Sequence, residues 1–390
     1  MHRARHTVAV AAPPGVVYGL LADAPRWPLH LPSCLHVERV DFDGTRDRLQ
    51  VWHLRNGRVR CTHARRTLHP QERRIDFELH DSPQADSPQA DSPQAGAVQP
   101  DAVQSGSWSV SPQGAGRSLL TLHRRHPAAC GAACQEPGAL QAQIRAQLEA
   151  VREAAERWDR LDELLLSFED SVYACGSPEI VYDFLYRVAD WADLVPHVER
   201  AEVTEDRPGV QRTLLHTSDP GTGDTSVTSA VRLCFPAAGR IVHKQIQAPG
   251  QAVHDQATAG QAVHDQAPAG QAVREQATAG QAVREQATAG QAVHEQVTAA
   301  GRAVVREQVL PSDLVAAYYG EWYLEPDASG VRVACAHQVM LRESVLHGAP
   351  GSGVLPADAR RQVREWLGRT STEALTLARW HAESALRRLR

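Results

Sequence analysis

The segment APPGVVYGLLADAPRWPLHLP at residues 12–32 recurs in altered form at residues 176–196, as GSPEIVYDFLYRVADWADLVP. Identical residues in the two copies stand 164 positions apart, among them Trp27 and Trp191. The match includes prolines, apolar helix residues and an aromatic residue, so it is not a simple compositional likeness. The sequence therefore predicts that one structural unit has been duplicated within the chain.

A second pair of matched segments follows the first. GSWSVSPQGAGRSLLTLHRRH begins at Gly106 and GEWYLEPDASGVRVACAHQVM at Gly320, so the spacing has grown to 214, and at this spacing His123 matches His337. The 50 additional residues must lie in the second copy before Gly320. Decapeptides of the type GQAVHDQATA fill about residues 248–303 of that interval, which predicts an insertion there.

Length and charge limit the class of protein. A chain of 390 residues is long enough for two domains, each with its own core. The formal net charge of -5 and the lack of a long Lys/Arg run argue against nucleic acid as the main partner. No apolar run reaches the roughly 20 residues that span a bilayer, and the first residues lack the apolar stretch of a secretory signal. We therefore expect a cytoplasmic protein that has no membrane partner.

The seven cysteines are odd in number and scattered, unlike a disulfide framework. Cys130 and Cys134 in CGAAC lack a second ligand pair at a suitable spacing, which argues against a zinc site. Three of the five decapeptides carry a histidine, but the other two carry arginine at that place, which argues against metal binding there as well. We expect no bound metal.

The order of expected elements is the same in both copies. In the first copy an alternating strand at residues 6–12 precedes a helix that starts near Pro14. Six candidate strands with turn residues between them follow, at 34–42, 47–55, 59–68, 73–80, 106–112 and 118–125. An amphipathic helix is expected over about 137–166, and the second copy ends in its own helix at about 356–389.

Two tracts do not fit a compact fold. Residues 81–96 contain three copies of DSPQA, and the decapeptide insertion has a similar composition. Both are poor in large apolar residues, so burial cannot offset the entropy lost on ordering them. We expect both to be expanded surface loops.

A strand, a helix, a run of antiparallel strands and a long final helix form the helix-grip arrangement. The expected fold class is α+β: two tandem helix-grip domains at 1–165 and 166–390, each a curved antiparallel sheet wrapped around its C-terminal helix with a cavity inside. The segments TVAVAAPPGVVYGLLADAPRWP, RVRCTHARRTLHPQERRIDFE, SAVRLCFPAAGRIVHKQ and LPSDLVAAYYGEWYLEPDASGV carry a closer likeness. With them the chain resembles the didomain aromatase/cyclases of bacterial type II polyketide pathways, which belong to the Bet v1-like superfamily.

The resemblance implies an enzyme that folds a poly-β-ketone bound to acyl carrier protein, closes the first ring by an aldol reaction and dehydrates it to an aromatic ring. It implies polyketide synthase components as partners and neither metal nor redox cofactor. Such chemistry needs a proton acceptor, a donor at the carbonyl and a cavity that sets the curvature of the chain. The alternative is a non-catalytic carrier of a hydrophobic ligand, lipid or quinone-like, which would need an apolar tunnel.

The resemblance implies a pocket arginine in a Ser-x-Arg strand motif. In THARRTL it falls on Arg66, with Ala64 in place of the serine, and in TSAVRLCF on Arg232. A permanently charged guanidinium suits a developing enolate or a pantetheine arm. Arg65 is a further candidate, but strand neighbours face opposite sides, so either Arg65 or Arg66 should face solvent.

The resemblance also implies a pocket histidine on the strand after the matched tryptophan, which makes His123 and His337 candidate acid–base residues. The related pattern has an aspartate on the last helix, but Gln147 and Ala374 occupy those places here. This departure puts histidine–aspartate dehydration in question, with Glu149 or Glu373 as substitutes. A third possibility is that only one domain reacts, and the missing serine makes the first copy the weaker candidate.

Four tryptophans occupy matched positions in the two copies. Trp27 and Trp191 follow the first helix of each copy, and Trp108 and Trp322 lie on strands. An aromatic residue matched in both copies is either core or a planar wall against which a growing ring stacks. They are candidate substrate-binding residues.

Overall fold

The computed structural model describes most of the chain outside the repeat tracts, namely residues 2–55, 57–81, 104–126, 137–219, 223–246, 311–346 and 354–388. All the described residues belong to one compact unit. The decapeptide insertion, the DSPQA tract after Asp81, and both cysteines of CGAAC lie outside the described residues.

The first sheet is antiparallel and has seven strands in the order β1-β7-β6-β5-β4-β3-β2. Its strands are β1 (His2–Val10), β2 (Cys34–Phe42), β3 (Arg46–Arg55), β4 (Arg58–His69), β5 (Arg74–Asp81), β6 (Gln104–Pro112) and β7 (Ser118–His126). Between β1 and β2 the chain forms α1 (Pro14–Ala22), η1 (Ala24–Arg26) and α2 (Trp27–His30). The helix that follows β7 is α3 (Pro137–Glu156).

The second sheet repeats this topology, in the order β8-β14-β13-β12-β11-β10-β9. Its strands are β8 (Leu165–Ala174), β9 (Val198–Arg207), β10 (Val210–Ser218), β11 (Thr225–Phe235), β12 (Arg240–Gln245), β13 (Val315–Pro326) and β14 (Val331–Leu341). Its helices are α5 (Pro178–Tyr186), η3 (Val188–Asp190), α6 (Trp191–Leu194), η4 (Pro236–Ala238), α8 (Glu343–Leu346) and α9 (Pro356–Arg388). The predicted duplication and the α+β fold class are confirmed, and we keep the domain boundary at 165/166 as a proposal.

The helix expected over 137–166 is shorter than predicted. It ends at Glu156 and is followed by η2 (Trp158–Arg160) and α4 (Leu161–Leu164), after which β8 begins at Leu165. The leucine-rich end of this segment has a helical pattern, but Leu165 pairs with Met340 in the ladder between β8 and β14. Tertiary pairing therefore overrides local helix propensity here.

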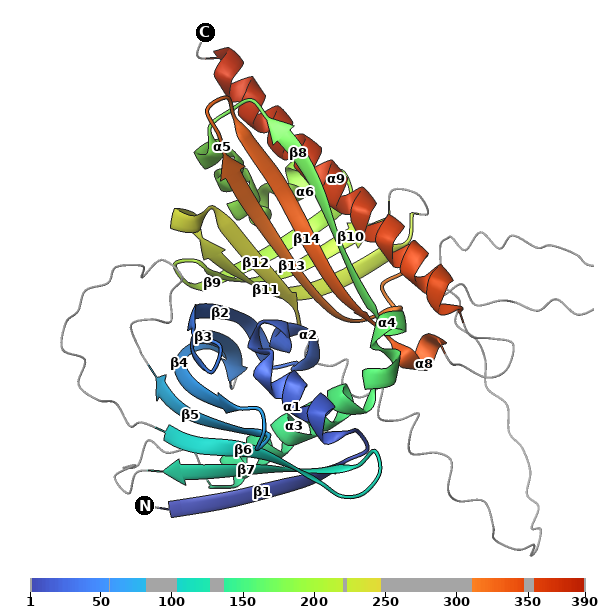
Figure 1. Ribbon diagram of the computed structural model, residues 1–390. Coiled ribbons are helices and arrows are strands. Elements are labelled where there is room, and N and C mark those ends of the chain that lie inside the picture. Colours follow the sequence, from blue (N-terminus) through green and yellow to red (C-terminus); the bar gives the residue numbers. More distant parts are fainter. Residues whose placement is uncertain are drawn as a thin grey trace, which may run out of the picture. The chain divides into compact units, whose positions relative to one another are not determined.

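Each long helix packs on its own sheet, as Figure 1 shows for α9 along β8 and β14. In α3, Ile144, Leu148 and Val151 lie at helical spacing and are buried in the core of the first sheet. The buried residues of α9 in the corresponding core are mostly small, such as Ala374 and Ala378. Smaller side chains at a helix–sheet contact fill less of the space between the two layers. Among the described residues, no helix is long and apolar enough to cross a membrane.

Gly320 of β13 and Gly106 of β6 leave room for a ring on the neighbouring strand. A Cβ atom at Gly320 would overlap the imidazole of His243, and one at Gly106 would lie 2.6 Å from Cζ of Phe77. The two glycines match at the spacing of 214. Their lack of a side chain is therefore a packing requirement of both sheets.

We expect Gly320→Ala to lower the free energy of unfolding by about 1–3 kcal/mol, because the added methyl forces the His243 ring out of its place. Chemical denaturation followed by circular dichroism measures this. The control is Gly19→Ala in α1, where a Cβ meets nothing within 4 Å, and it should leave stability unchanged or raise it. Equal stability of Gly320→Ala and wild type would contradict the packing argument.

Candidate active site

A cavity of about 160 Å³ lies between the second sheet and α9. Strands and helix both contribute to its lining. Polar lining residues include Arg232, His243, Tyr318, His337 and Ser371, and the indoles of Trp191 and Trp322 add apolar surface. The structure thus brings four of the predicted site residues, Arg232, His337, Trp191 and Trp322, into one cavity.

Arg232, His243 and His337 of this cavity lie on one line across the sheet. The strand register pairs Gln211 with Arg232 and Arg232 with His243. It continues by pairing His243 with Gly320 and Gly320 with His337. Directly opposed residues of adjacent strands have side chains on the same face, so these five positions share the cavity side of the sheet. We call them the second-sheet row.

The first sheet has an equivalent line of residues, which we call the first-sheet row. Its register pairs run through Asp47, Arg66, Phe77, Gly106 and Arg124. The matched glycine and the matched arginine occupy the same places in both rows. The other three places differ: aspartate replaces glutamine, phenylalanine replaces the first histidine and arginine replaces the second.

The predicted match of His123 with His337 therefore does not hold in space. The register pairs Gly320 with His337 but Gly106 with Arg124, the residue after His123. A shift of one residue along a strand moves a side chain to the opposite face of the sheet. His123 is accordingly exposed, whereas His337 is buried.

Arg65 and His123 lie on the exposed face of the first sheet. Together with Arg66 and Asp47, they line an open groove of about 990 Å³ that runs over several strands. Arg65 is exposed, whereas Arg66 is buried, in agreement with the expectation that only one of the two faces solvent.

Arg66 is paired with a buried carboxylate. Its Nε and Nη2 donate to the two carboxylate oxygens of Asp47 at 2.8 and 2.5 Å. Nη1 and Nη2 donate to the carbonyl oxygens of Leu21 and Ala22, at 2.8 and 2.9 Å. The guanidinium also lies 5.1 Å from the centre of the Trp27 ring. Because both members of the pair are buried, the charge of Arg66 is balanced inside the protein.

Arg232 has the same surroundings without the carboxylate. Its Nη1 donates to Oε1 of Gln211 at 2.7 Å and to the carbonyl oxygen of Tyr186 at 3.3 Å, and Nη2 donates to the carbonyl oxygen of Leu185. Burial lowers the pKa of Arg232. Among the described residues, no carboxylate forms an ion pair with it. The cavity therefore contains a buried, unbalanced positive charge.

His337 is a neutral imidazole. Burial lowers its pKa to about 4, although the nearby Asp170 acts in the opposite direction. Its Nδ1 lies 2.9 Å from the hydroxyl oxygen of Tyr318, and its Nε2 lies 3.6 Å from Oδ2 of Asp170. The ring stacks on Phe168 with 4.4 Å between ring centres. His337 can therefore exchange a proton with Tyr318.

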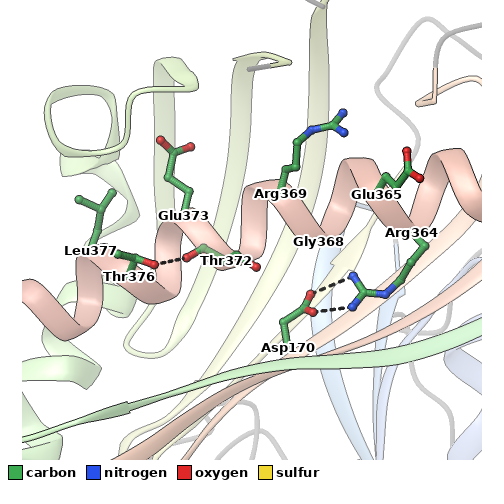
Figure 2. A pocket seen from close by; sticks show the side chains of 9 residues that line it. All are labelled: Asp170, Arg364, Glu365, Gly368, Arg369, Thr372, Glu373, Thr376 and Leu377. Atoms are coloured by element: carbon green, nitrogen blue, oxygen red, sulfur yellow. Dashed lines mark hydrogen bonds and ion pairs between the residues drawn. The ribbon is translucent and has the colours of Figure 1, made fainter. Parts of the chain in front are cut away.

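Asp170 of β8 is held by the last helix. Arg364 of α9 donates from Nη2 and Nη1 to the two carboxylate oxygens at 2.7 and 3.4 Å, and the hydroxyl of Ser371 donates to Oδ2 at 2.7 Å. Figure 2 shows Arg364 and Asp170 facing each other across the gap between α9 and β8. The carboxylate near His337 therefore comes from the first strand of this copy rather than from its last helix. Sequence reasoning missed it.

The other expected carboxylates lie elsewhere. Ala374 is buried in the core, and the neighbouring Glu373 binds Nδ1 of His197. The cavity has a second imidazole at His243, whose ring meets Tyr318 edge to face at 5.1 Å. Burial, with Arg232 and His337 nearby, lowers the pKa of His243 to about 3.

The tryptophans differ between the two copies. Trp191 and Trp322 meet edge to face at 6.4 Å and line the cavity. Trp108 is buried in the core of the first sheet, and the Trp27 indole donates to the carbonyl oxygen of Leu20 at 3.1 Å. The described residues contain no group of three or more metal-ligating side chains.

Two seven-stranded antiparallel sheets, each packed on a long helix, define a tandem helix-grip protein with a polar cavity in its second half. A family model described as polyketide cyclase/dehydrase and lipid transport matches residues 1–156. The granaticin polyketide synthase bifunctional cyclase/dehydratase of Streptomyces violaceoruber is 30% identical over 238 residues, 60% of this chain and 68% of that protein. The actinorhodin polyketide synthase bifunctional cyclase/dehydratase of Streptomyces coelicolor is 30% identical over 266 residues, 64% of this chain and 76% of that protein.

Solved structures agree with this. The di-domain aromatase/cyclase BexL of the BE-7585A pathway has a TM-score of 0.68 at 25% identity and covers 98% of this chain and 99% of its own. StfQ of the steffimycin pathway, also a di-domain aromatase/cyclase, has a TM-score of 0.67 at 21% identity and the same coverage. This chain belongs to the bifunctional polyketide cyclase/dehydratase family. The enzyme class expected from the sequence, a polyketide aromatase/cyclase, is confirmed.

We expect His243→Phe to reduce the loss of stability in acid. The substitution gives position 243 the residue type that Phe77 has at the equivalent place of the first-sheet row. The pKa of His243 is about 3 when folded and near 6.5 when unfolded, so the unfolded chain alone binds this proton between those values. Stability should therefore fall by up to about 1.4 kcal/mol per pH unit below pH 6.5 from this group. Denaturation between pH 7 and pH 5 measures the slope, with His123→Phe as the exposed control. An unchanged slope in His243→Phe would contradict the assignment.

Proposed function

We propose that the second-sheet cavity is where this enzyme, in the cytoplasm, folds a poly-β-ketone carried by acyl carrier protein, closes its first ring and dehydrates that ring. The observation that carries the proposal is Arg232, a buried guanidinium without a carboxylate partner. A buried charge of this kind is costly unless something balances it. An enolate or alkoxide formed in the cavity would supply the missing negative charge.

The reaction removes a proton from a substrate carbon twice and adds a proton to a substrate oxygen twice. In the aldol step a methylene between two carbonyls loses a proton, its carbon bonds to a second carbonyl carbon, and the resulting alkoxide gains a proton. In the dehydration step a neighbouring carbon loses a proton and the protonated hydroxyl leaves as water. Arg232 offsets the negative charge in both steps, and a neutral imidazole such as His337 is suited to accept protons.

The size of the cavity bears on which part of the substrate enters it. At about 160 Å³ it is smaller than the several hundred Å³ typical of sites for drug-sized ligands. It is therefore suited to the reacting ring, with the rest of the chain extending outside. Trp191 and Trp322 provide aromatic surface against which a flat ring can stack.

The first sheet plays a different part in this proposal. Arg66 is already balanced by Asp47, so it has no free charge to offer an enolate. We therefore assign the reaction to the second copy and a supporting role to the first. The polar second-sheet row also favours an enzyme over a carrier of lipid or quinone, because a carrier would gain nothing from an unbalanced charge.

Reconstitution with a minimal polyketide synthase and a ketoreductase tests this proposal. We expect Arg232→Gln to reduce formation of the aromatised first ring about 100-fold or more, the loss typical of removing one group that stabilises an oxyanion. The matched control is the double variant Arg66→Gln/Asp47→Asn, which removes the first-sheet pair without leaving an unpaired buried charge. It should keep most of the activity.

Two outcomes would count against the proposal. Loss of product in the double variant alone would assign the reaction to the first sheet. A wild-type enzyme that leaves the spectrum of spontaneous products unchanged would favour the carrier alternative.

A further inference from the structure

Tyr318 contributes the cavity hydroxyl group that lies next to His337. We propose that Tyr318 is a catalytic acid–base residue, that His337 relays protons to and from it, and that the carboxylate of Asp170 positions His337 and balances the charge of its imidazolium. The proposal rests on the assignment of the second-sheet cavity as the reaction site. It adds a residue with a defined role to the chemistry outlined above.

The position of Tyr318 supports direct access to a substrate. It lies two residues before Gly320 on β13, so its side chain is on the cavity side of the sheet. It lines the cavity, and its hydroxyl lies 2.9 Å from Nδ1 of His337. Burial raises the pKa of Tyr318 well above its usual value, so a free phenolate is disfavoured. Its hydroxyl can then accept a proton only while it gives one away.

Asp170 fixes the direction of the relay. Its Oδ2 is 3.6 Å from Nε2 of His337, beyond hydrogen-bond distance, but its negative charge favours the neutral tautomer with the proton on Nε2 and with Nδ1 free to accept. The Tyr318 hydroxyl then donates to Nδ1, and a lone pair of its oxygen remains for the substrate. Arg364 and Ser371 hold the carboxylate in place. A proton that arrives at Nδ1 gives an imidazolium beside Asp170.

The proton balance closes over each step. When Tyr318 takes a proton from a substrate methylene, its own proton passes to Nδ1 of His337. In the aldol step the relay returns that proton through Tyr318 to the new alkoxide. In the dehydration step it returns the proton to the departing hydroxyl, which leaves as water. The relay ends each step in its starting state, and no other reactant is needed.

The first sheet lacks every member of this relay. Gln104 lies two residues before Gly106, where Tyr318 lies two before Gly320, and Arg124 takes the place of His337. Arg124 donates to the amide oxygen of Gln104, a contact that cannot transfer protons near neutral pH. The place of Asp170, opposite Cys335 in the second sheet, is held by His6, opposite Leu122. The copy that has the unbalanced arginine is therefore also the copy that has the relay.

The test compares Tyr318→Phe with Tyr323→Phe in the reconstituted system. Both variants remove one phenol oxygen from β13, but Tyr323 points to the other face and bonds the exposed Glu169. We expect Tyr318→Phe to reduce formation of the aromatised ring by 100-fold or more, the usual range for loss of a general acid–base. Tyr323→Phe should match the wild type.

The positioning role of Asp170 needs a readout that simple structural damage would not change. In mixtures of H₂O and D₂O, a relay that moves two protons together gives a curved dependence of rate on deuterium content. We expect curvature in the wild type and a straight line in Asp170→Asn. A straight line in the wild type would overturn the relay.

The outcome also separates this inference from the proposed function. If Arg232→Gln loses activity and Tyr318→Phe keeps it, the relay is wrong and the site assignment stands. If neither variant loses activity, the site assignment itself fails.

Discussion

A buried guanidinium must have its charge balanced, and the two halves of this protein meet that requirement in different ways. In the first sheet Asp47 forms a two-point ion pair with Arg66, so the charge is balanced within the fold. In the second sheet Gln211 stands at the same register position and offers only an amide oxygen to Arg232. One change from carboxylate to amide thus leaves a cationic site that favours anionic intermediates.

The strand register makes this comparison possible. Each row crosses its sheet through a glycine, because a ring on the adjacent strand occupies the space of the missing side chain. With Gly106 and Gly320 as fixed points, the two rows align residue by residue. The two sheets share the glycine that their packing requires, whereas the polar side chains at equivalent positions of the two rows differ. The second copy has imidazoles and a phenol where the first has Phe77, an arginine and an amide.

Much of the architecture could be predicted from the sequence. The internal repeat predicted two sheets of the same topology, and the strand motifs located Arg66 and Arg232. Both predictions rest on short stretches of sequence. The pairing of His123 with His337 failed because equal spacing along a chain does not guarantee equal register, and one residue reverses the face. Asp170 could not be found, since its approach to His337 depends on pairing between strands more than 160 residues apart.

The measurement that tests the central claim most directly is a reciprocal exchange of the residues that face the two arginines. Gln211→Asp should balance the charge of Arg232 and reduce formation of the aromatised ring about 100-fold, with the fold retained. Asp47→Gln should leave product formation close to the wild-type level in protein that remains folded. Full activity in Gln211→Asp, or loss of activity confined to Asp47→Gln, would contradict the account.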